Sequence, residues 1–456
     1  MKLRKILLKA LVGIIVISPT TQSFAACQSN SCRIDMELKK NLEYPEILEE
    51  SEIYGIYPPE WNDDDFLETI TKEKLNLLIS NTAEKISKLG LTLNKNVDVH
   101  NSYAPFTNGD VIAKLFSTIS WYEEISETDA IQYFVDNNLL TFNLNLKDEC
   151  SVEQAIVLAK NLIDDTYEKF DAGGKGYVYK VENKGNTVYL VGTTHSGIAD
   201  MYPLNQKLLD AFYKADVVAK EINPDDEDMQ VYRDSLSYTD GTTLKDHLDE
   251  QTYEKVWQVF ELMEAPEEQK DLLKYTTILN LNELFDLYIR TLSNKNNDGD
   301  AAKIAKLQAM RGIDSYFDAK VNPVKQKLIG LETLKSKVER FASNSDASIE
   351  RLNSLIDIIL SGNTENIIPT DIASADLDKS LEAWANGDVE GFFSVIGEGI
   401  SGCERDINFT KGIVKMLESD EQQTYFVMLG AAHYLLDNAV TDLLEEKGYT
   451  VENFYN

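Results

Sequence analysis

Two apolar stretches of the chain end in the same way, and they limit the folds that the chain can adopt. Residues 188–195 read VYLVGTTH and residues 426–433 read FVMLGAAH, so each apolar run passes into Gly-x-x-His. A short apolar run that ends in glycine is typical of a buried strand that leads into a loop. In α/β proteins, ligands bind at the carboxyl ends of such strands. Because the chain has only four histidines, we expect His195 and His433 to face one cleft and to share a metal ion or a reacting group.

The pattern around these runs predicts a sheet with helices on its faces. Strands are expected at residues 177–182, 187–191, 216–222, 328–332, 424–429 and 449–454, the first two forming a hairpin around residues 183–186. Helices are expected at residues 203–215 and 434–447 and over most of residues 244–310 and 334–362. The predicted fold class is therefore α/β (or α+β), with a central mixed sheet flanked by helices and built from two related halves.

The start of the chain has the pattern of a secretory signal. Four basic residues precede the apolar run at residues 10–17, and Ser23-Phe24-Ala25 supplies small residues for cleavage. We assign residues 1–26 to a signal peptide and expect a secreted, periplasmic or cell-surface protein. The apolar run is too short to span a membrane comfortably, so no transmembrane span is expected after the signal is removed. The sequence before Cys27 also resembles a lipoprotein processing site, with Phe24 in place of the usual leucine, so a lipid anchor is an alternative.

The charge of the chain limits its partners. The signal carries four basic and no acidic residues, so its removal takes the formal charge from −33 to −37. Such a surface repels nucleic acid and anionic membranes. The even number of cysteines allows disulfides in an exported protein. Cys27 and Cys32 are close enough to pair locally, and the sequence leaves open whether Cys150 pairs with Cys403.

Residues 27–172 form a predicted N-terminal domain that is mainly helical. Helices are expected at residues 72–89, 111–119, 129–138 and 151–170. The last two loosely resemble the helical repeat of S-layer homology modules, but we favour a plain helical region. The glycine-rich residues 171–176 mark the boundary, after which residues 173–456 form the second domain.

Four side chains at or near predicted strand ends could carry chemistry: His195, Glu221, Glu332 and His433. Two imidazoles with one or two carboxylates could bind Mn, Fe, Co or Zn and leave a coordination position open. Without a metal, the same groups could act as general base and general acid. Arg405 lies between two acidic residues and could stabilise a developing oxyanion.

Each of these residues also has a structural interpretation. A histidine at a strand end often only makes a structural hydrogen bond, although the two matched contexts favour function. Glu221 could form an exposed ion pair, Glu332 could cap a following helix, and Arg405 could bridge the neighbouring acids. His100 and His247 lack a comparable context, and we interpret both as structural or exposed.

These residues lie in segments that resemble the TraB/GumN family, which includes the TIKI proteins. The resemblance runs from Tyr177 to Phe454 and rests on several segments in order: YLVGTTH, DMYPLNQKLLDAFYKADVVAKEI, GIDSYF, LIGLET, WANGD, CERDINFTKGI, FVMLGAAHYL and LLEEKGYTV. The order and number of these segments make the match specific. The chain departs from the family pattern at Ser196, where a bulkier residue is frequent, and at Asp406, where asparagine is common.

The resemblance implies a fold akin to the erythromycin-esterase/ChaN-like group. It implies His195, Glu221 and His433 as metal ligands or working residues, with Glu332 and Arg405 in support. TIKI proteins are metal-dependent proteases that favour manganese or cobalt over zinc, whereas the esterase relatives need no metal and the ChaN relatives bind haem. We therefore expect an exported, metal-dependent, peptidase-like hydrolase that acts on a peptide or small molecule. The alternatives are a metal-free esterase and a non-catalytic cell-surface protein that binds haem, a metal or a peptide signal.

Overall fold

The computed structural model describes most of the chain after the predicted signal. It covers residues 42–92, 106–125, 129–140, 144–223, 226–263, 265, 270–293, 301–336, 345–362, 374–397 and 401–455. The signal peptide, Cys27, Cys32 and His100 lie outside the described residues.

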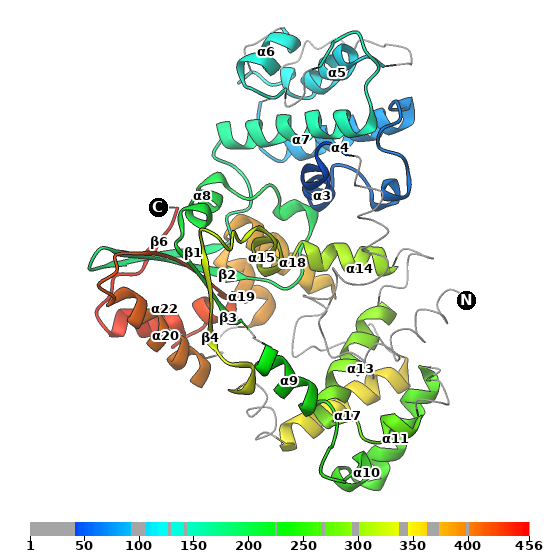
Figure 1. Ribbon diagram of the computed structural model, residues 1–456, viewed down its shortest axis with the longest axis vertical. Helices are drawn as coiled ribbons and strands as arrows, with labels where there is room; N and C mark the ends of the chain where they lie inside the picture. The colour runs from blue at the N-terminus through cyan, green and yellow to red at the C-terminus, as the bar shows by residue number, and fades with distance from the viewer. Residues whose placement is uncertain are drawn as a thin grey trace.

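A single mixed sheet of six strands organises the second half of the molecule (Figure 1). The strands are β1 (Tyr177–Asn183), β2 (Asn186–Thr193), β3 (Val217–Ile222), β4 (Lys327–Glu332), β5 (Thr424–Gly430) and β6 (Glu452–Asn453). Their order across the sheet is β4-β3-β5-β2-β1-β6. Strands β4, β3, β5 and β2 are parallel, and β1 pairs antiparallel with both β2 and β6. The predicted fold class and all six predicted strands are confirmed.

The hairpin between β1 and β2 sets the register at one side of the sheet. Lys184 and Gly185 form its two-residue turn with φ values of +51° and +84°, as a type I′ turn requires. The next residue, Asn186, is fully buried. Its amide nitrogen donates to the carbonyl of Ser419 at 2.6 Å, and its side-chain oxygen accepts from the N–H of Gln423 at 2.8 Å. These bonds connect the start of β2 to the loop that leads into β5.

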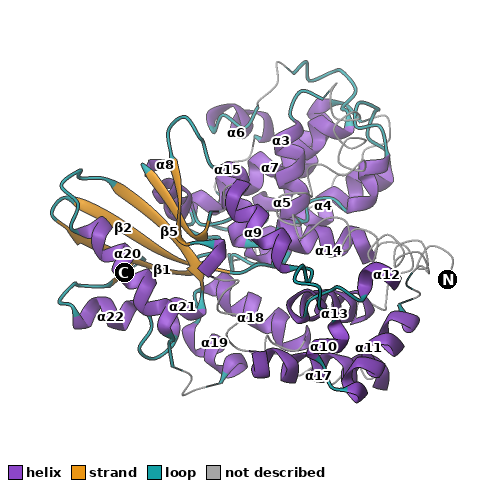
Figure 2. Cartoon of the chain, turned by 60° about the horizontal axis from the view of Figure 1, so that its bottom comes forward, coloured by secondary structure: helices purple, strands orange, loops and turns teal. Residues whose placement is uncertain are grey.

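Both faces of the sheet are buried, so its central strands are apolar on both sides. Along β5, Phe426 and Met428 belong to one hydrophobic cluster, and Val427 and Leu429 belong to another. Helices α20 (Glu404–Leu417) and α22 (Val440–Glu446) cover the Val427 face, whereas α8 (Gln206–Lys214), α15 (Ile313–Lys320) and α18 (Ser374–Asn386) contribute to the Phe426 cluster. Figure 2 shows the strands between these sets of helices.

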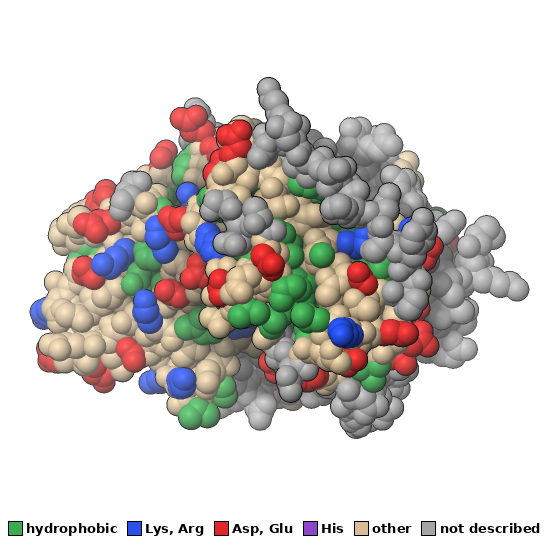
Figure 3. All heavy atoms as spheres, turned by 90° about the horizontal axis from the view of Figure 1, so that it is seen from above, with side chains coloured by type: hydrophobic (Ala, Val, Ile, Leu, Met, Phe, Trp, Pro, Cys, Tyr) green, Lys and Arg blue, Asp and Glu red, His purple; other side chains and the backbone are tan. Residues whose placement is uncertain are grey.

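Among the described residues, the N-terminal region contains the four helices that the sequence predicts and one more, α3. They are α3 (Pro45–Tyr54), α4 (Lys72–Ser87), α5 (Asn108–Ser120), α6 (Ala130–Asp136) and α7 (Val152–Lys169). Thr107 and Ser151 begin α5 and α7 with capping boxes. One hydrophobic cluster continues from these helices to the sheet, so the region packs directly against the sheet. Figure 3 views the molecule from the side of these helices and shows acidic and basic side chains interspersed.

A further group of helices lies beyond the carboxyl ends of the parallel strands (Figure 1). It comprises α9 (Asp226–Ser235), α10 (Leu244–His247), α11 (Glu250–Leu262), α12 (Lys270–Leu273), α13 (Ile278–Ser293), α14 (Ala301–Met310) and α17 (Ser345–Ser361). Helices α11, α13 and α17 share a hydrophobic cluster of their own. The short helix α19 (Val389–Ile396) follows α18 beside the sheet.

One predicted helix needs correction, and the structure decides a cysteine pairing that the sequence left open. The helix predicted over residues 434–447 is two helices, α21 (Ala432–Leu435) and α22. The helix is interrupted because Asn438 adopts a left-handed φ of +55°. In addition, the carbonyl of Asp437 accepts the N–H of Gly402 in place of a bond within a helix. Cys150 is buried, Cys403 is exposed, and both thiols are free, so the two do not pair. No helix among the described residues is long and apolar enough to cross a membrane.

Two basic side chains form hydrogen bonds between the N-terminal helices and the sheet region. The ammonium of Lys85 on α4 donates to the carbonyls of Ala199 and Tyr202. Arg311 donates from Nε to the carbonyl of Ile53 at 2.8 Å and from Nη2 to that of Glu52 at 3.1 Å. Because Lys85 is only 5% exposed, burial lowers the pKa of its ammonium to about 7.

Replacing Lys85 by methionine is expected to remove a pH dependence of stability. The pKa of Lys85 is lower in the folded chain than its ordinary value, so the unfolded chain binds more protons above pH 7 and wild-type stability rises with pH there. This slope cannot exceed about 1.4 kcal/mol per pH unit. Thermal unfolding at pH 6.5 to 9 should therefore show a difference between wild type and Lys85→Met that grows with pH. Lys88→Met, one turn away and more exposed, is the matched control; parallel curves for wild type and Lys85→Met would refute the assignment.

Candidate functional site

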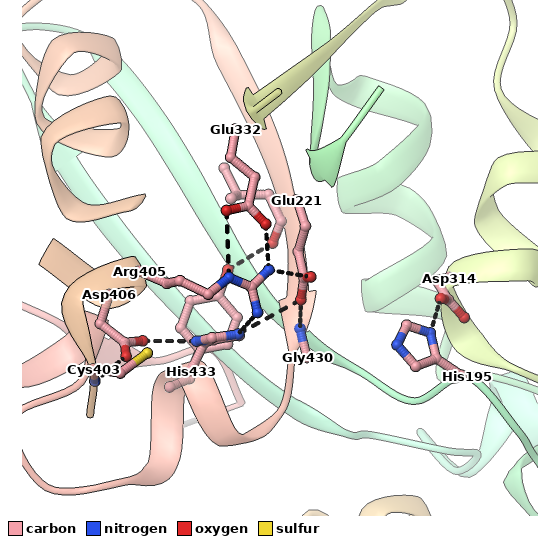
Figure 4. Close-up of polar contacts among 11 residues, drawn as sticks. His195, Glu221, Asp314, Glu332, Cys403, Arg405, Asp406, Gly430 and His433 are labelled. Atoms are coloured by element: carbon pink, nitrogen blue, oxygen red, sulfur yellow. Dashed lines mark hydrogen bonds and ion pairs between the residues drawn. The ribbon is translucent and has the colours of Figure 1, made fainter. Parts of the chain in front are cut away.

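The carboxyl ends of the parallel strands meet at one edge of the sheet. In the paired registers, Thr193 of β2 lies opposite Gly430 of β5, and Ile222 of β3 lies opposite Glu332 of β4. Side chains that follow these strands are therefore presented at the same edge. The structure brings Glu221, Glu332, Arg405 and His433 together there (Figure 4); we call these four residues the Arg405 cluster.

Arg405 lies in the first turn of α20 and connects the two glutamates. Its Nη2 is 2.7 Å from Oε2 of Glu221 and 2.5 Å from Oε1 of Glu332. The guanidinium carbon lies 5.0 Å from the centre of the Phe409 ring, within range of a cation–π contact. Burial disfavours the charge of Arg405, but its bonds to Glu332 and Glu221 outweigh burial and raise the pKa of the guanidinium. Arg405 therefore neutralises two partly buried carboxylates.

Glu221 is held in its ionised form at the end of β3. Besides Arg405, its Oε1 accepts the backbone N–H of Gly430 at 3.0 Å. Burial raises the pKa of this carboxyl, but the charge of Arg405 and the Gly430 N–H more than compensate, so the net pKa lies below its ordinary value. The glycine of the second Gly-x-x-His thus supplies a hydrogen-bond donor to the site.

His433 is oriented by a buried aspartate. Its Nδ1 is 2.8 Å from Oδ1 of Asp406, which is 2% exposed. The other oxygen of Asp406 accepts the N–H of Cys403 at 2.7 Å. Burial opposes ionisation of Asp406, but its hydrogen bonds with His433 and Cys403 hold the pKa of the carboxyl below its usual range. An ionised Asp406 requires a proton on Nδ1, which leaves Nε2 of the neutral imidazole as an acceptor.

The acceptor nitrogen of His433 faces charged groups of both signs. Nε2 lies 3.3 Å from Nη1 of Arg405 and 3.7 Å from Oε1 of Glu221. The imidazole is 14% exposed and the Arg405 side chain 25% exposed, so a small molecule can reach both. An imidazole held in one tautomer by a carboxylate is the arrangement that histidine needs to act as a general base.

His195 lies apart from the Arg405 cluster and has its own aspartate. Its Nδ1 is 2.5 Å from Oδ2 of Asp314, and its side chain is 83% exposed. Figure 4 shows this pair on the other side of Gly430 from His433. The two histidines that were expected to share one centre therefore form two separate His–Asp pairs along the same strand edge.

The loop of His195 packs closely against the start of α15, which carries Asp314. The N–H of Ile313 donates to the carbonyl of Thr194 at 2.9 Å. A Cβ on Gly312 would lie 2.6 Å from the carbonyl oxygen of His195, so only glycine fits this position. These contacts explain why GIDSYF accompanies the first Gly-x-x-His.

Sequence reasoning did not place Asp314 and Asp406 among the working residues. Both lie in the first turn of a helix, whereas the sequence pattern pointed to residues at strand ends. A signal was present for each, since Asp314 lies in GIDSYF and Asp406 replaces the more common asparagine. His247, by contrast, stacks on Tyr238 with ring centres 4.0 Å apart, which agrees with a structural role.

The metal site that the resemblance implies does not fit this arrangement. The implied site would need the carboxylate oxygens of Glu221 and the ring nitrogens of both His195 and His433 as metal ligands. Here Arg405 already donates to Glu221 and Glu332, and His195 lies apart. Among the described residues, no group of three or more His, Cys, Asp or Glu side chains is placed to hold a metal ion.

Trp384 supports the first Gly-x-x-His from the face of the sheet that carries the Phe426 cluster. It is fully buried in α18, and its Nε1 donates to the carbonyl of Gly192 at 2.7 Å. A Cβ on Gly176, whose φ is +63°, would lie 2.4 Å from the indole. Gly387 ends α18 with a φ of +64°, and Asp388 caps α19 through the N–H of Gly391. The WANGD segment is therefore structural and fixes the end of β2.

Comparison with known proteins agrees with this arrangement of motifs. No curated protein and no solved structure matches the chain. One family model, that of the TraB/PrgY/gumN family, matches residues 177–453, which include all six strands and both Gly-x-x-His motifs. Because this match spans more than half of the 456 residues, the chain belongs to the TraB/PrgY/gumN family.

Proposed function

We propose that the protein is an exported, peptidase-like hydrolase whose reacting centre is the Arg405 cluster. The observation that carries the proposal is the contact between His433 and Asp406, which directs Nε2 toward Arg405 at the open strand edge. A base beside a fixed cation is what hydrolysis of a carbonyl substrate requires. The substrate class is a peptide or a small ester or lactone.

The proposed reaction uses only groups that the chain supplies. Nε2 of His433 takes a proton from water as the water oxygen attacks the carbonyl carbon. The tetrahedral oxyanion is stabilised by Nη1 of Arg405, and the imidazolium is stabilised by Asp406 and Glu221. When the intermediate collapses, the bond to the amine or alcohol breaks, and the leaving group takes the proton from His433. His195, held by Asp314, lies along the same edge and would contact the more distant part of the substrate.

Dependence on manganese or cobalt is the second form of this proposal, and the family resemblance alone supports it. The oxygens that would ligate the ion accept hydrogen bonds from Arg405 in the structure. We therefore place the metal-free reaction first. Metal content and manganese or cobalt titration of wild type, His195→Ala and His433→Ala distinguish the two forms, because a shared metal site would be lost in both variants.

The proposal is tested by hydrolysis of a panel of p-nitrophenyl esters, lactones and fluorogenic peptides, with and without EDTA. His433→Ala is expected to lower kcat/KM by about 10²–10⁴-fold, the range of general-base catalysis. His247→Ala, in the same chain but stacked on Tyr238, is the matched control and should leave the rate unchanged. Equal rates for wild type and His433→Ala would refute the proposal. Binding of haem or peptides without turnover would establish the non-catalytic alternative.

Asp406 is a positioning residue in this scheme, and Asp406→Asn should lower kcat by about 10²–10⁴-fold with little change in KM. An asparagine oxygen that keeps the bond to the Cys403 N–H turns its NH₂ toward Nδ1 of His433. The imidazole must then carry its proton on Nε2, where it cannot act as a base. A kcat equal to that of wild type, or a change in KM alone, would contradict this role.

Export belongs to the proposal and rests on residues 1–26. The expected mature chain begins at Cys27, or carries lipid at Cys27 if the lipoprotein-like sequence is processed. The mass of the N-terminal peptide from the exported protein decides between the two, and an intact Met1 end would contradict both.

A further inference from the structure

The loop that follows the first Gly-x-x-His has little regular structure of its own. It runs over residues 194–203 between β2 and α8 and contains one short 3-10 helix, η2 (Ala199–Met201); we call it the His195 loop. Buried backbone N–H and C=O groups nearly always have a hydrogen-bond partner. The backbone of the His195 loop therefore depends on partners from other parts of the chain.

One side of the His195 loop rests on the segment between α14 and α15. The N–H of Gly197 donates to the carbonyl of Gln308 at 2.9 Å, and the hydroxyl of Tyr202 donates to the carbonyl of Arg311 at 2.7 Å. A Cβ on Gly197 would clash with the same carbonyl oxygen of Arg311, so only glycine fits there. The backbone of the loop is thus in direct contact with that of Arg311.

The other side of the His195 loop contacts the N-terminal helices. The ammonium of Lys85 on α4 donates to the carbonyls of Ala199 and Tyr202, the second at 2.8 Å. Tyr202 also stacks on Tyr54 of α3, with ring centres 6.0 Å apart. The hydroxyl of Tyr167 on α7 donates to the backbone carbonyl of Lys85 at 2.8 Å. Helices α3, α4 and α7 therefore all support this side of the loop, directly or through Lys85.

Arg311 connects the two sides. Its guanidinium donates to the carbonyls of Ile53 and Glu52 at the end of α3, while its backbone lies against the His195 loop. Helix α15 begins two residues later and carries Asp314, the partner of His195. The N-terminal helices thus contact both segments that set the position of His195, namely the loop beneath it and the segment that leads into α15.

These contacts matter because the His195 side chain is 83% exposed and is held by Asp314 at the strand edge (Figure 4). An exposed side chain packs little against its surroundings, so its position depends on the backbone beneath it and on the groups that support that backbone. The family match begins at residue 177, so α3, α4 and α7 lie outside it. In this chain, a family motif is therefore supported by helices that the family model does not contain.

We propose that the N-terminal helices are a required part of the functional site, in which Lys85 and Arg311 position His195 for contact with the substrate. Both side chains act through the His195 loop and are therefore positioning residues. This inference rests on the proposed function, because that proposal assigns His195 to the more distant part of the substrate. It gives the N-terminal region a role beyond stability.

The inference is tested by NMR of the full mature chain labelled with ¹⁵N-histidine. His195→Ala identifies the ring signals of His195 among those of the four histidines. Arg311→Met and Lys85→Met should each shift or broaden the His195 signals and leave those of His433 in place. Arg311→Lys keeps the charge but not the planar fork of donors, so it should return the His195 signals part of the way to their wild-type positions.

Kinetic constants give a second measurement. Arg311→Met and Lys85→Met should raise KM for the fluorogenic peptides at least about tenfold, with a smaller change in kcat, because His195 binds the substrate away from the reacting carbonyl. Lys85→Met decides the matter if Arg311→Met does not fold. Because the NMR signals need no turnover, failure of the proposed hydrolysis leaves the NMR test intact.

Lys320→Met is the matched control. It breaks another ion pair between α15 and α3, at the other end of α15 from Asp314, and its His195 signals and KM should equal those of wild type. Unchanged His195 signals in folded Arg311→Met and Lys85→Met would overturn the inference. Equal changes in Lys320→Met would also overturn it, because they would show a general loosening of the fold.

Discussion

Replacing Arg405 by methionine is expected to lower both the stability of the protein and its proposed hydrolytic activity. The substitution leaves Glu221 and Glu332 close together without the cation that neutralises them. Removing one partner of a buried ion pair costs about 3–5 kcal/mol, and we expect about 3 kcal/mol because these side chains are partly exposed. Loss of the oxyanion donor should also lower kcat by about 10²–10³-fold. Denaturant unfolding and the assay described above measure the two effects.

The pH dependence identifies the cause of the destabilisation. The pKa of Glu221 is lowered in the folded chain, mainly because the charge of Arg405 outweighs burial. The stability that it contributes is present above the ordinary pKa of glutamate and is lost as the pH falls through the lowered value. The difference between wild type and Arg405→Met should therefore be largest at neutral pH and should shrink toward pH 4. Lys411→Met, an exposed position on the same helix, is the control; a pH-independent difference would contradict the electrostatic explanation.

Replacing Trp384 by alanine is expected to cost about 3–5 kcal/mol of folding free energy, the range for a buried tryptophan. The indole is completely buried, packs on Gly176 and donates to the carbonyl of Gly192. Its removal leaves a cavity and an unsatisfied carbonyl beneath the first Gly-x-x-His. Thermal and denaturant unfolding of the variant would measure the loss.

Trp384→Phe separates the two contributions of the indole. Phenylalanine keeps most of the packing but cannot donate to Gly192, so it should cost about 1–3 kcal/mol, the penalty of an unsatisfied buried group. Addition of indole to Trp384→Ala should recover part of the loss, because the cavity has the shape of the missing ring. A change of less than 1 kcal/mol in Trp384→Ala would show that WANGD does not support the end of β2.

The parts of the fold that sequence alone predicted are those with local causes. The apolar runs and the turn around residues 183–186 each act within a few residues, so the strands and helices that they define were predictable. The break between α21 and α22 depends on Asp437, which contacts Gly402 from another part of the chain. The helical periodicity of apolar residues does not indicate such a contact.

At the Arg405 cluster too, local patterns were predictable and contacts between distant segments were not. Glu221, Glu332 and His433 are strand-end residues, and parallel pairing alone was enough to expect them at one edge. The partners that orient them were harder to find, because Asp406 and Asp314 reach the edge from helices. The sequence also did not predict that Arg405 binds two carboxylates, because Glu221 and Glu332 reach it from strands distant along the chain. Only the three-dimensional structure shows that the two histidines lie in separate pairs.

The position of β5 in the sheet has a consequence for biogenesis. This strand begins at Thr424, yet it lies in the middle of the sheet between β2 and β3. Contacts between residues so distant along the chain form slowly, and the ribosome releases the last residues only at the end of synthesis. The centre of the sheet therefore cannot close on a nascent chain until nearly all of the chain has been made. The Arg405 cluster, which needs Gly430 at the end of β5 and His433 after it, can form only after that point.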